Sequence, residues 1–544
     1  MSKEKPSSVD AHVILADKVL AWAARNSVNA SRRKDPERAA QWAELGGRVT
    51  GQFGSALLSH SGIENVLCAA LGPASSAAQQ IASPLGPLRW LHVFTESYKT
   101  GGHTALARRW IDLDPSNDQH DLVLTNQLVD KAAPALLEAI TKRGGTVTAL
   151  LLGAPTLTAR ARRLRALAAT CDAVVLHVHP WDTVPVMAFG AAGGPPVFFL
   201  NHADHLFWLG CSVSDRVLNI RPSGEALCAP YRGITRSLRL PLPLPAPPAS
   251  AGDAIGQALR TTLGIAADAV VFLTIGSRFK YLPIDGFSFL DAAAQVLERN
   301  PQAFLIAVGP SNEQDGWPAL RARFGNRFNA VGTHTDIQPF LAAANIYLEG
   351  FPFGSLTAML EAVIAGLPPV LAPAQCPLPY RSDDFGLDDL PVAPDIEAYV
   401  QLATALAGDK QQRIALSQRC AERVRGLHCV PAWPEHLATL RNLVKGGLVH
   451  QTYPLQTTTL MDAYRVRYWA AFSLIGNADN AFSWVFHAAL NRGLRPKVDV
   501  ELHRALTQAR SEGVAVSNAW VATFGSNMLS ALPHSFSMWA YMRA

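Results

Sequence analysis

The chain has 544 residues, of which 49% are hydrophobic and 17% are charged. This length suits two to four domains, and this composition suits large buried cores rather than disorder. The net charge of +5 is mild, and no dense Lys/Arg run carries interleaved aromatic residues. The sequence therefore argues against nucleic acid as a partner, whereas an anionic small ligand is compatible with the charge.

The cysteines and the N-terminal residues indicate the compartment. Seven cysteines are scattered along the chain, an odd number without CxxC spacing. They predict reduced core thiols, and neither a disulfide framework nor a zinc site. The first residues lack the apolar core of a signal peptide, and no run reaches about 18 uninterrupted apolar residues. We expect a cytoplasmic protein without a transmembrane segment, and leave peripheral membrane contact and a homo-oligomer open.

The chain divides into five parts. Short apolar runs alternate with helical stretches in two regions, and this alternation predicts parallel sheets covered by helices. A Pro-rich stretch between them is typical of a semi-rigid linker. The expected fold class is α/β, with two Rossmann-like domains facing across a cleft. The parts are a helical N-terminal extension (1–85), the first domain (86–240), the linker (241–253), the second domain (254–445) and a helical C-terminal segment (446–544).

Four polar clusters follow predicted strands, where open α/β sheets bind ligands. The first cluster, at 95–104, follows the first strand and precedes a helix. Gly101 and Gly102 can cradle a phosphate or a sugar there, and His103 would face the crevice. A glycine pair is also common in an ordinary turn, so both interpretations stay open.

The second cluster, at 177–182, begins with two histidines. His177 and His179 are two residues apart and would share one face of a strand. Zinc could use such a pair, but no third ligand is evident, so we expect no metal. His179 is a candidate for the sugar side of a site, and the alternative is a pair of histidines with ordinary hydrogen bonds at a strand end.

The third cluster, at 201–208, places two histidines and an aspartate within four residues of a strand end. Packing alone explains this density poorly. His202 or His205 could act as a base or orient a hydroxyl, and Asp204 could hold an imidazole. We expect His202 to face the crevice and Asp204 to be structural.

The fourth cluster, at 274–280, follows the first strand of the second domain. Arg278 and Lys280 could stabilise a leaving diphosphate in place of a divalent metal. The alternative is two solvated surface cations.

Residues 344–372 contain a strand, a Gly/Pro loop, a helix from about 356 to 365 and another strand. Ser355 can cap the helix, whose first-turn N–H groups then form an anion site at Ser355, Leu356 and Thr357. Gly354 would let a ligand approach closely, and Glu361, one turn inside, could reach a ribose. An ordinary strand–loop–helix unit explains this segment equally well.

Two absences narrow the choice of enzyme class. No GxGxxG follows a strand, which disfavours a dinucleotide dehydrogenase, and there is no Walker P-loop. Asp112 and Asp114 form a DxD sequence, the metal–nucleotide signature of a different transferase fold. They lie at a helix end rather than after a core strand, so we interpret both as surface residues.

At this point the clusters resemble those of GT-B glycosyltransferases, over roughly 88–445. Segments 174–182 and 198–204 are similar to the paired histidine segments of glycogen-synthase-like transferases, and the resemblance implies that His202 lies near the transferred sugar. It also implies that Arg278 and Lys280 hold the donor diphosphate and Glu361 the ribose. Glu349, twelve residues before Glu361, departs from the usual spacing of paired glutamates in that group.

Segments 280–283 and 351–357 also resemble the O-GlcNAc transferases and the bacterial protein N-glucosyltransferases. In those enzymes a lysine three residues before a proline, and an F-P-x-(N/G)-x-x-T loop, lie on the diphosphate. They invert the anomeric centre, unlike the glycogen-synthase-like group. The stereochemistry of this chain therefore stays open.

Together these features predict a metal-independent GT-B glycosyltransferase. It would move a hexose or an N-acetylhexosamine from a nucleotide-diphosphate sugar, with UDP as the expected nucleotide, to a protein, glycan or lipid acceptor. The donor would lie on the second domain and the acceptor on the first, and His202, His205 and His103 are the candidate catalytic residues. No cofactor is expected. A nucleotide-sugar epimerase of the same fold, or a non-catalytic nucleotide-sugar-binding subunit, is the alternative.

Overall fold

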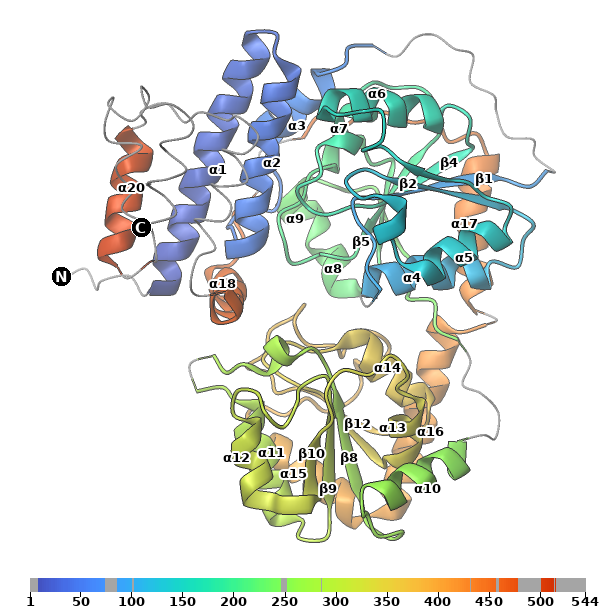
Figure 1. Cartoon of the computed structure of the whole chain (residues 1–544), viewed down its shortest axis with the longest axis vertical. Coiled ribbons are helices and arrows are strands. Elements are labelled where there is room, and N and C mark those ends of the chain that lie inside the picture. Colours follow the sequence, from blue (N-terminus) through green and yellow to red (C-terminus); the bar gives the residue numbers. More distant parts are fainter. Residues whose placement is uncertain are drawn as a thin grey trace.

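The computed structural model describes residues 8–73, 86–99, 102–245, 252–284, 286–430, 432–455, 459–477, 500–512 and 514. Two parallel sheets, each covered by helices, lie one above the other along the long axis of the molecule (Figure 1). The expected fold class, two Rossmann-like α/β domains, is therefore confirmed.

The first sheet has seven strands in the order β3-β2-β1-β4-β5-β6-β7. Its inner strands are almost wholly buried, and this is why they are continuous apolar runs in the sequence. The strands are β1 (Arg89–Phe94), β2 (Gln119–Leu124), β3 (Val147–Ala149), β4 (Ala173–His177), β5 (Val197–Asn201), β6 (Arg216–Asn219) and β7 (Ser237–Arg239). The helices between them are α4 (Gly102–Leu113), α5 (Pro134–Lys142), α6 (Leu157–Ala168), α7 (Val184–Ala188), α8 (Pro222–Ala226) and α9 (Cys228–Arg232).

The second sheet has five strands in the order β10-β9-β8-β11-β12. Its strands are β8 (Val271–Ile275), β9 (Phe304–Val308), β10 (Phe328–Ala330), β11 (Ile346–Leu348) and β12 (Pro369–Val370). A 3-10 turn, η3 (Arg278–Tyr281), follows β8. The helices are α10 (Gly252–Thr262), α11 (Phe289–Arg299), α12 (Trp317–Phe324), α13 (Gln338–Ala343), α14 (Leu356–Ile364), α15 (Ile396–Gly408) and α16 (Lys410–His428).

Both sheets have a topological switch point, at which the direction of winding reverses. It lies between β1 and β4 in the first sheet and between β8 and β11 in the second. In such sheets the loops that leave the carboxyl ends of these strands form the ligand crevice. The polar clusters of each domain therefore lie together at the carboxyl ends of the strands of its sheet.

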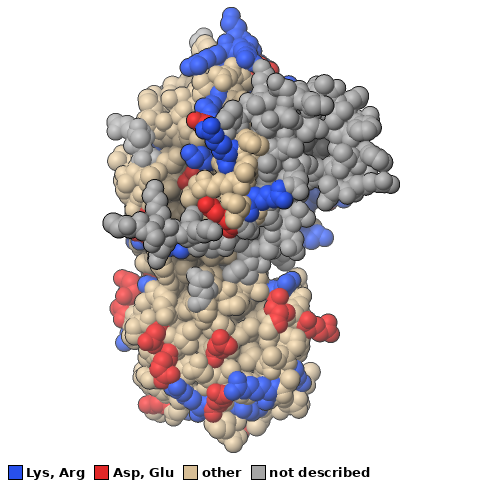
Figure 2. All heavy atoms as spheres, turned by 90° about the vertical axis from the view of Figure 1, so that its left-hand side faces the viewer, with Lys and Arg blue, Asp and Glu red and all other residues tan. Residues whose placement is uncertain are grey.

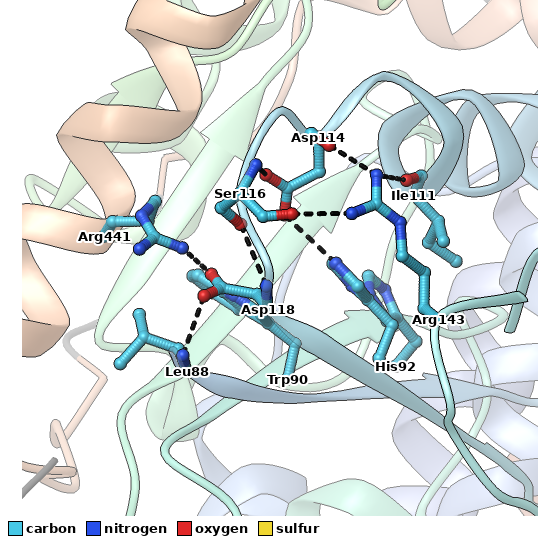
Figure 3. Close-up of polar contacts among 10 residues, drawn as sticks. Leu88, Trp90, His92, Ile111, Asp114, Ser116, Asp118, Arg143 and Arg441 are labelled. Atoms are coloured by element: carbon cyan, nitrogen blue, oxygen red, sulfur yellow. Dashed lines mark hydrogen bonds and ion pairs between the residues drawn. The ribbon is translucent and has the colours of Figure 1, made fainter. Parts of the chain in front are cut away.

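After α16 the chain crosses back to the first domain as α17 (Ala432–Lys445), which runs beside that domain in Figure 1. The indole of Trp433 meets that of Trp110 edge to face, with 6.0 Å between ring centroids. Arg441 pairs with Asp118, which also accepts hydrogen bonds from the Leu88 N–H and the Trp90 indole (Figure 3). Although its residues lie within 254–445, α17 thus packs on the first domain.

The terminal segments form a separate helical layer beside the first domain (Figure 1). It contains α1 (Ser8–Arg32), α2 (Pro36–Phe53), α3 (Ser61–Ala69), α18 (Ala463–Asn477) and α20 (Val500–Ser511). Asp35 caps α2 by accepting a bond from the Arg38 N–H, with Pro36 in the first turn. Buried Glu64 of α3 joins the layer to the first domain by accepting the Gly210 N–H at 2.6 Å.

All seven cysteines are unpaired thiols. Among the described residues, no helix is both long and apolar enough to cross a bilayer. On the face drawn in Figure 2, the second domain carries acidic side chains interspersed with basic ones.

Candidate functional site

A cleft of about 530 Å³ lies between the two domains, at the carboxyl ends of both sheets. The first domain contributes Gly102, His103, Leu106, His202, His205, Ile220, Arg221 and Leu242 to its lining. The second contributes the ends of β8 and β9, Lys280, Thr333, His334, Ile337, residues 353–358, Pro379, Tyr380 and Ser382. The lining within the described residues carries two cations and four histidines and no carboxylate, so the cleft suits an anionic ligand.

The start of α14 forms one wall of the cleft. Ser355 is at its N-cap, but the Ser355 side chain makes no capping hydrogen bond, so the predicted cap is wrong. A Cβ at Gly276 would lie 2.5 Å from Ser355 Oγ, which therefore packs against the end of β8. The first-turn N–H groups of α14 are left facing the loop, together with the positive end of the helix dipole.

Gly354 is required by crowding inside the protein. A Cβ at this position would lie 2.4 Å from Glu349 Oε1 and 2.7 Å from Ser382 Oγ. From its sequence context, Gly354 was expected to allow the close approach of a ligand. In the structure its missing side chain makes room for a buried carboxyl group.

Glu349 is fully buried directly after β11. Its Oε2 accepts the Ala372 N–H at 2.9 Å. Burial raises the pKa of this carboxyl to about 7, against the opposing effect of that hydrogen bond. Glu349 therefore lies behind Gly354, outside the lining, and changes charge near neutral pH.

Lys280 lines the cleft and Arg278 does not. Lys280 Nζ donates to the Gly354 carbonyl at 3.0 Å, and burial, with the nearby Arg221, lowers its pKa to about 8. Arg278 is half exposed and pairs with Asp315. The 3-10 turn η3 explains the difference: with three residues per turn, side chains two residues apart diverge by about 120° around its axis and so point in different directions.

His202 and His103 stack in the first-domain wall, with 5.2 Å between ring centroids. His202 Nδ1 donates to the Leu200 carbonyl at 3.2 Å, so its Nε2 carries a lone pair. Burial, with the neighbouring His103, lowers the pKa of His202 to about 3, and burial also lowers that of His103. Both rings are therefore neutral at physiological pH.

The other predicted residues of the first loops differ in placement. Gly102 lines the cleft, whereas Gly101 lies outside the described residues. His179 does not line it and stacks instead on Tyr98, with 5.8 Å between ring centroids. Its ring is 6.0 Å from that of His103, so His179 supports the wall from behind.

Asp204 does not line the cleft, but it holds a cation that does. Its Oδ1 accepts from Arg221 Nη2 at 2.7 Å, and this pairing keeps the pKa of Asp204 well below its usual range despite complete burial. His205 lies beside it, 4.5 Å from the Trp469 ring on α18. Arg221 was not predicted from the sequence; the available signal was a basic residue two positions after the end of β6.

Glu361 is partly buried and is absent from the lining of the cleft. Its carboxylate pairs with Arg109 of α4, so this contact joins the two domains. Arg109 was not predicted from the sequence.

The interpretation of the DxD sequence as surface is wrong for Asp114. Asp112 pairs with Arg108 at the surface, whereas Asp114 is buried and accepts from the Ser116 N–H at 2.8 Å (Figure 3). Its second oxygen contacts His120. Within the described residues, no group of three or more His, Cys, Asp or Glu is arranged to hold a metal ion.

Comparison with protein-family models finds no match, and neither does comparison with curated proteins. Among solved structures, a glycosyltransferase from Rickettsia africae ESF-5 is 9% identical, covers 66% of this chain and 100% of its own, and has a TM-score of 0.52. A mutant of the Thermobaculum terrenum O-GlcNAc transferase is 16% identical over 81% of this chain and 84% of its own, with a TM-score of 0.47. Anabaena Alr3699/HepE in complex with UDP-glucose is 17% identical over 65% and 100%, with a TM-score of 0.48. The fold of this chain is the two-domain GT-B fold.

Proposed function

We propose that this protein is a glycosyltransferase that uses a nucleotide-diphosphate sugar. The observation that carries the proposal is the polarity of the cleft, which has the buried Arg221, the half-buried Lys280, a helix N-terminus and no carboxylate among its described lining residues. A diphosphate brings two negative charges that need such an environment. A solved structure that shares this fold, from Rickettsia africae ESF-5, is a glycosyltransferase.

We assign the donor to the second domain. Lys280, the N–H groups at Ser355–Thr357 and, from across the cleft, Arg221 would hold the diphosphate. When the bond from the sugar to the diphosphate breaks, the leaving group takes the electron pair, and these cations stabilise the charge that develops. They would take the place of a divalent metal.

We assign the acceptor to the first domain, with His103, His202 and His205 around it. The lone pair on His202 Nε2 can accept a hydrogen bond from a hydroxyl of the sugar or of the acceptor as the new glycosidic bond forms. Within the proposal the transferred unit is a hexose or an N-acetylhexosamine on UDP, and the acceptor is a protein, a glycan or a lipid.

The test is incubation of the full chain with UDP-glucose, UDP-galactose and UDP-N-acetylglucosamine, with and without acceptor pools, followed by quantification of UDP and mass spectrometry of products. Acceptor-dependent UDP release and a mass increase of one sugar are expected. Rearranged sugar without acceptor would instead establish the epimerase, and binding without turnover would establish the non-catalytic subunit.

A further inference from the structure

Three buried histidines and one aspartate form a continuous hydrogen-bonded chain inside the first domain. Asp114 Oδ2 contacts His120 Nε2 at 3.1 Å, His120 Nδ1 contacts His92 Nε2 at 2.9 Å, and His92 Nδ1 contacts His177 Nε2 at 2.9 Å. All four side chains are buried. None of these residues lines the cleft, so the proposed function leaves the chain unexplained.

The hydrogen-bonded series of side chains crosses the first sheet on a diagonal. His120 of β2 pairs in register with Trp90 of β1, and His177 of β4 pairs with Phe94. Positions 90, 92 and 94 of β1 share one face of the sheet because side chains alternate along a strand. The imidazoles of His120, His92 and His177 therefore lie in this order from the amino end to the carboxyl end of the strands, and the carboxyl end faces the cleft.

The charge of Asp114 gives the chain a direction. Its hydrogen bonds, above all those from His120 and Ser116, outweigh the effect of burial and hold the pKa of this carboxyl at about 2, so it is ionised and can only accept. A neutral His120 then carries its proton on Nε2 and presents a lone pair on Nδ1. The same constraint passes to His92 and His177, because burial lowers the pKa of each and keeps both rings neutral.

The last nitrogen of this hydrogen-bonded series, His177 Nδ1, is buried and has no hydrogen-bond partner among the described residues. His177 is the last residue of β4, and the adjoining strand ends lead to His103 and His202 in the cleft wall. A buried acceptor of this kind is normally satisfied by a hydrogen-bond donor, and a water or a substrate hydroxyl can supply one.

We propose that Asp114, acting through His120 and His92, fixes the tautomer of His177 and thereby presents His177 Nδ1 as a hydrogen-bond acceptor for a hydroxyl at the base of the cleft. Asp114 is then a positioning residue. The assignment of a catalytic benefit rests on the proposed function, whereas the assignment of the tautomers does not.

An isosteric substitution of Asp114 should reverse the donor and acceptor roles along the series of hydrogen bonds. Asp114 Oδ1 accepts the Ser116 N–H at 2.8 Å, so in Asp114→Asn the amide oxygen would stay there and the NH₂ group would face His120 Nε2 (Figure 3). His120 Nε2 would become an acceptor and its Nδ1 a donor. The reversal would pass through His92 and convert His177 Nδ1 from an acceptor into a donor.

The experiment is NMR of ¹⁵N-histidine-labelled full chain, in which one-bond ¹⁵N–¹H couplings identify the protonated nitrogen of each ring. Wild-type protein is expected to show the proton of all three rings on Nε2, and Asp114→Asn is expected to show it on Nδ1. The matched control is Asp118→Asn, which changes a neighbouring buried carboxylate that takes no part in the hydrogen bonds from Asp114 to His177. This variant should keep the wild-type tautomers.

A wild-type His177 with its proton on Nδ1, or Asp114→Asn protein that keeps the wild-type tautomers, would overturn the proposal. The wild-type spectrum decides even if the variant fails to fold. Added UDP-glucose distinguishes the hydroxyls: a shifted His177 Nδ1 signal assigns the bond to the sugar, and an unshifted one assigns it to water. If the protein is a transferase, kcat should fall about tenfold in Asp114→Asn with KM for the donor retained, the scale of one hydrogen bond.

Discussion

Lys280 and Glu349 lie on either side of the Gly354 backbone, and both change charge near neutral pH. Lys280 donates to the Gly354 carbonyl, and Glu349 Oε1 lies against the Gly354 Cα. Burial is the main cause of both shifts: it lowers the pKa of Lys280 to about 8 and raises that of Glu349 to about 7. Below pH 7 this region is therefore cationic, and above pH 8 it is anionic.

Donor affinity should fall as the pH rises from 6 to 9. The carboxyl of Glu349 gains a negative charge first, and Lys280 then loses its positive charge, so both changes oppose an anionic ligand. UDP-glucose is the suitable probe in isothermal titration because its phosphates do not titrate in this range. In Glu349→Gln the fall should begin only near pH 8, the pKa of Lys280. A pH-independent Kd in the wild type would contradict this account.

His202→Ala should reduce transfer by about 10²-fold or more, the usual scale for a positioned proton-transfer group. Donor affinity should stay close to wild type, because the diphosphate contacts belong mainly to the second domain. His202→Gln, which can place an acceptor near the Nε2 position, should restore part of the rate. Product assays paired with titration of UDP-glucose separate these effects, and equal losses of binding and turnover in His202→Ala would show a structural role instead.

Two helices at the periphery of the first domain, α4 and α17, connect the two domains. α4 reaches α14 through the Arg109–Glu361 pair, and α17 returns from the second domain to Asp118 and Trp110. The first contact lies beside the cleft and the second lies away from it. A ligand can therefore affect the first contact while α17 keeps the domains joined.

Glu361 can bind a ribose only if its pair with Arg109 opens. Arg109→Ala should therefore strengthen UDP binding, and Glu361→Gln should weaken it, each by about tenfold, the scale of one hydrogen bond to a charged group. Isothermal titration of UDP measures both. If the two variants change the Kd in the same direction, the pair acts on domain closure rather than on ribose binding.

The strands were largely predictable from the sequence, whereas many of the side-chain ion pairs were not. Buried parallel strands are apolar runs in the sequence, so both α/β regions were predictable, and the polar residues that follow the strands converge as the topology requires. Asp204 with Arg221, and Arg109 with Glu361, are 17 and 252 residues apart, and no local pattern marks such pairs. Asp114 was misjudged because its burial depends on neighbouring strands.

At the scale of the whole molecule, two positive groups from different domains face the same cleft. This arrangement leads us to expect transfer without a divalent metal, because the cations neutralise the diphosphate directly. Activity should therefore survive EDTA within about twofold, well below the loss of one electrostatic group. A loss that Mg²⁺ or Mn²⁺ restores would show that a metal takes part.

The central claim is that the diphosphate binds at Lys280 and the start of α14. The most direct measurement is isothermal titration of UDP-glucose into the full chain, into Lys280→Ala and into Arg278→Ala. The two variants each remove one cation from the same 3-10 turn, but only Lys280 lines the cleft. We predict that Lys280→Ala weakens binding by about tenfold or more and that Arg278→Ala binds like the wild type. Equal effects of the two variants, or unchanged binding in Lys280→Ala, would contradict the account.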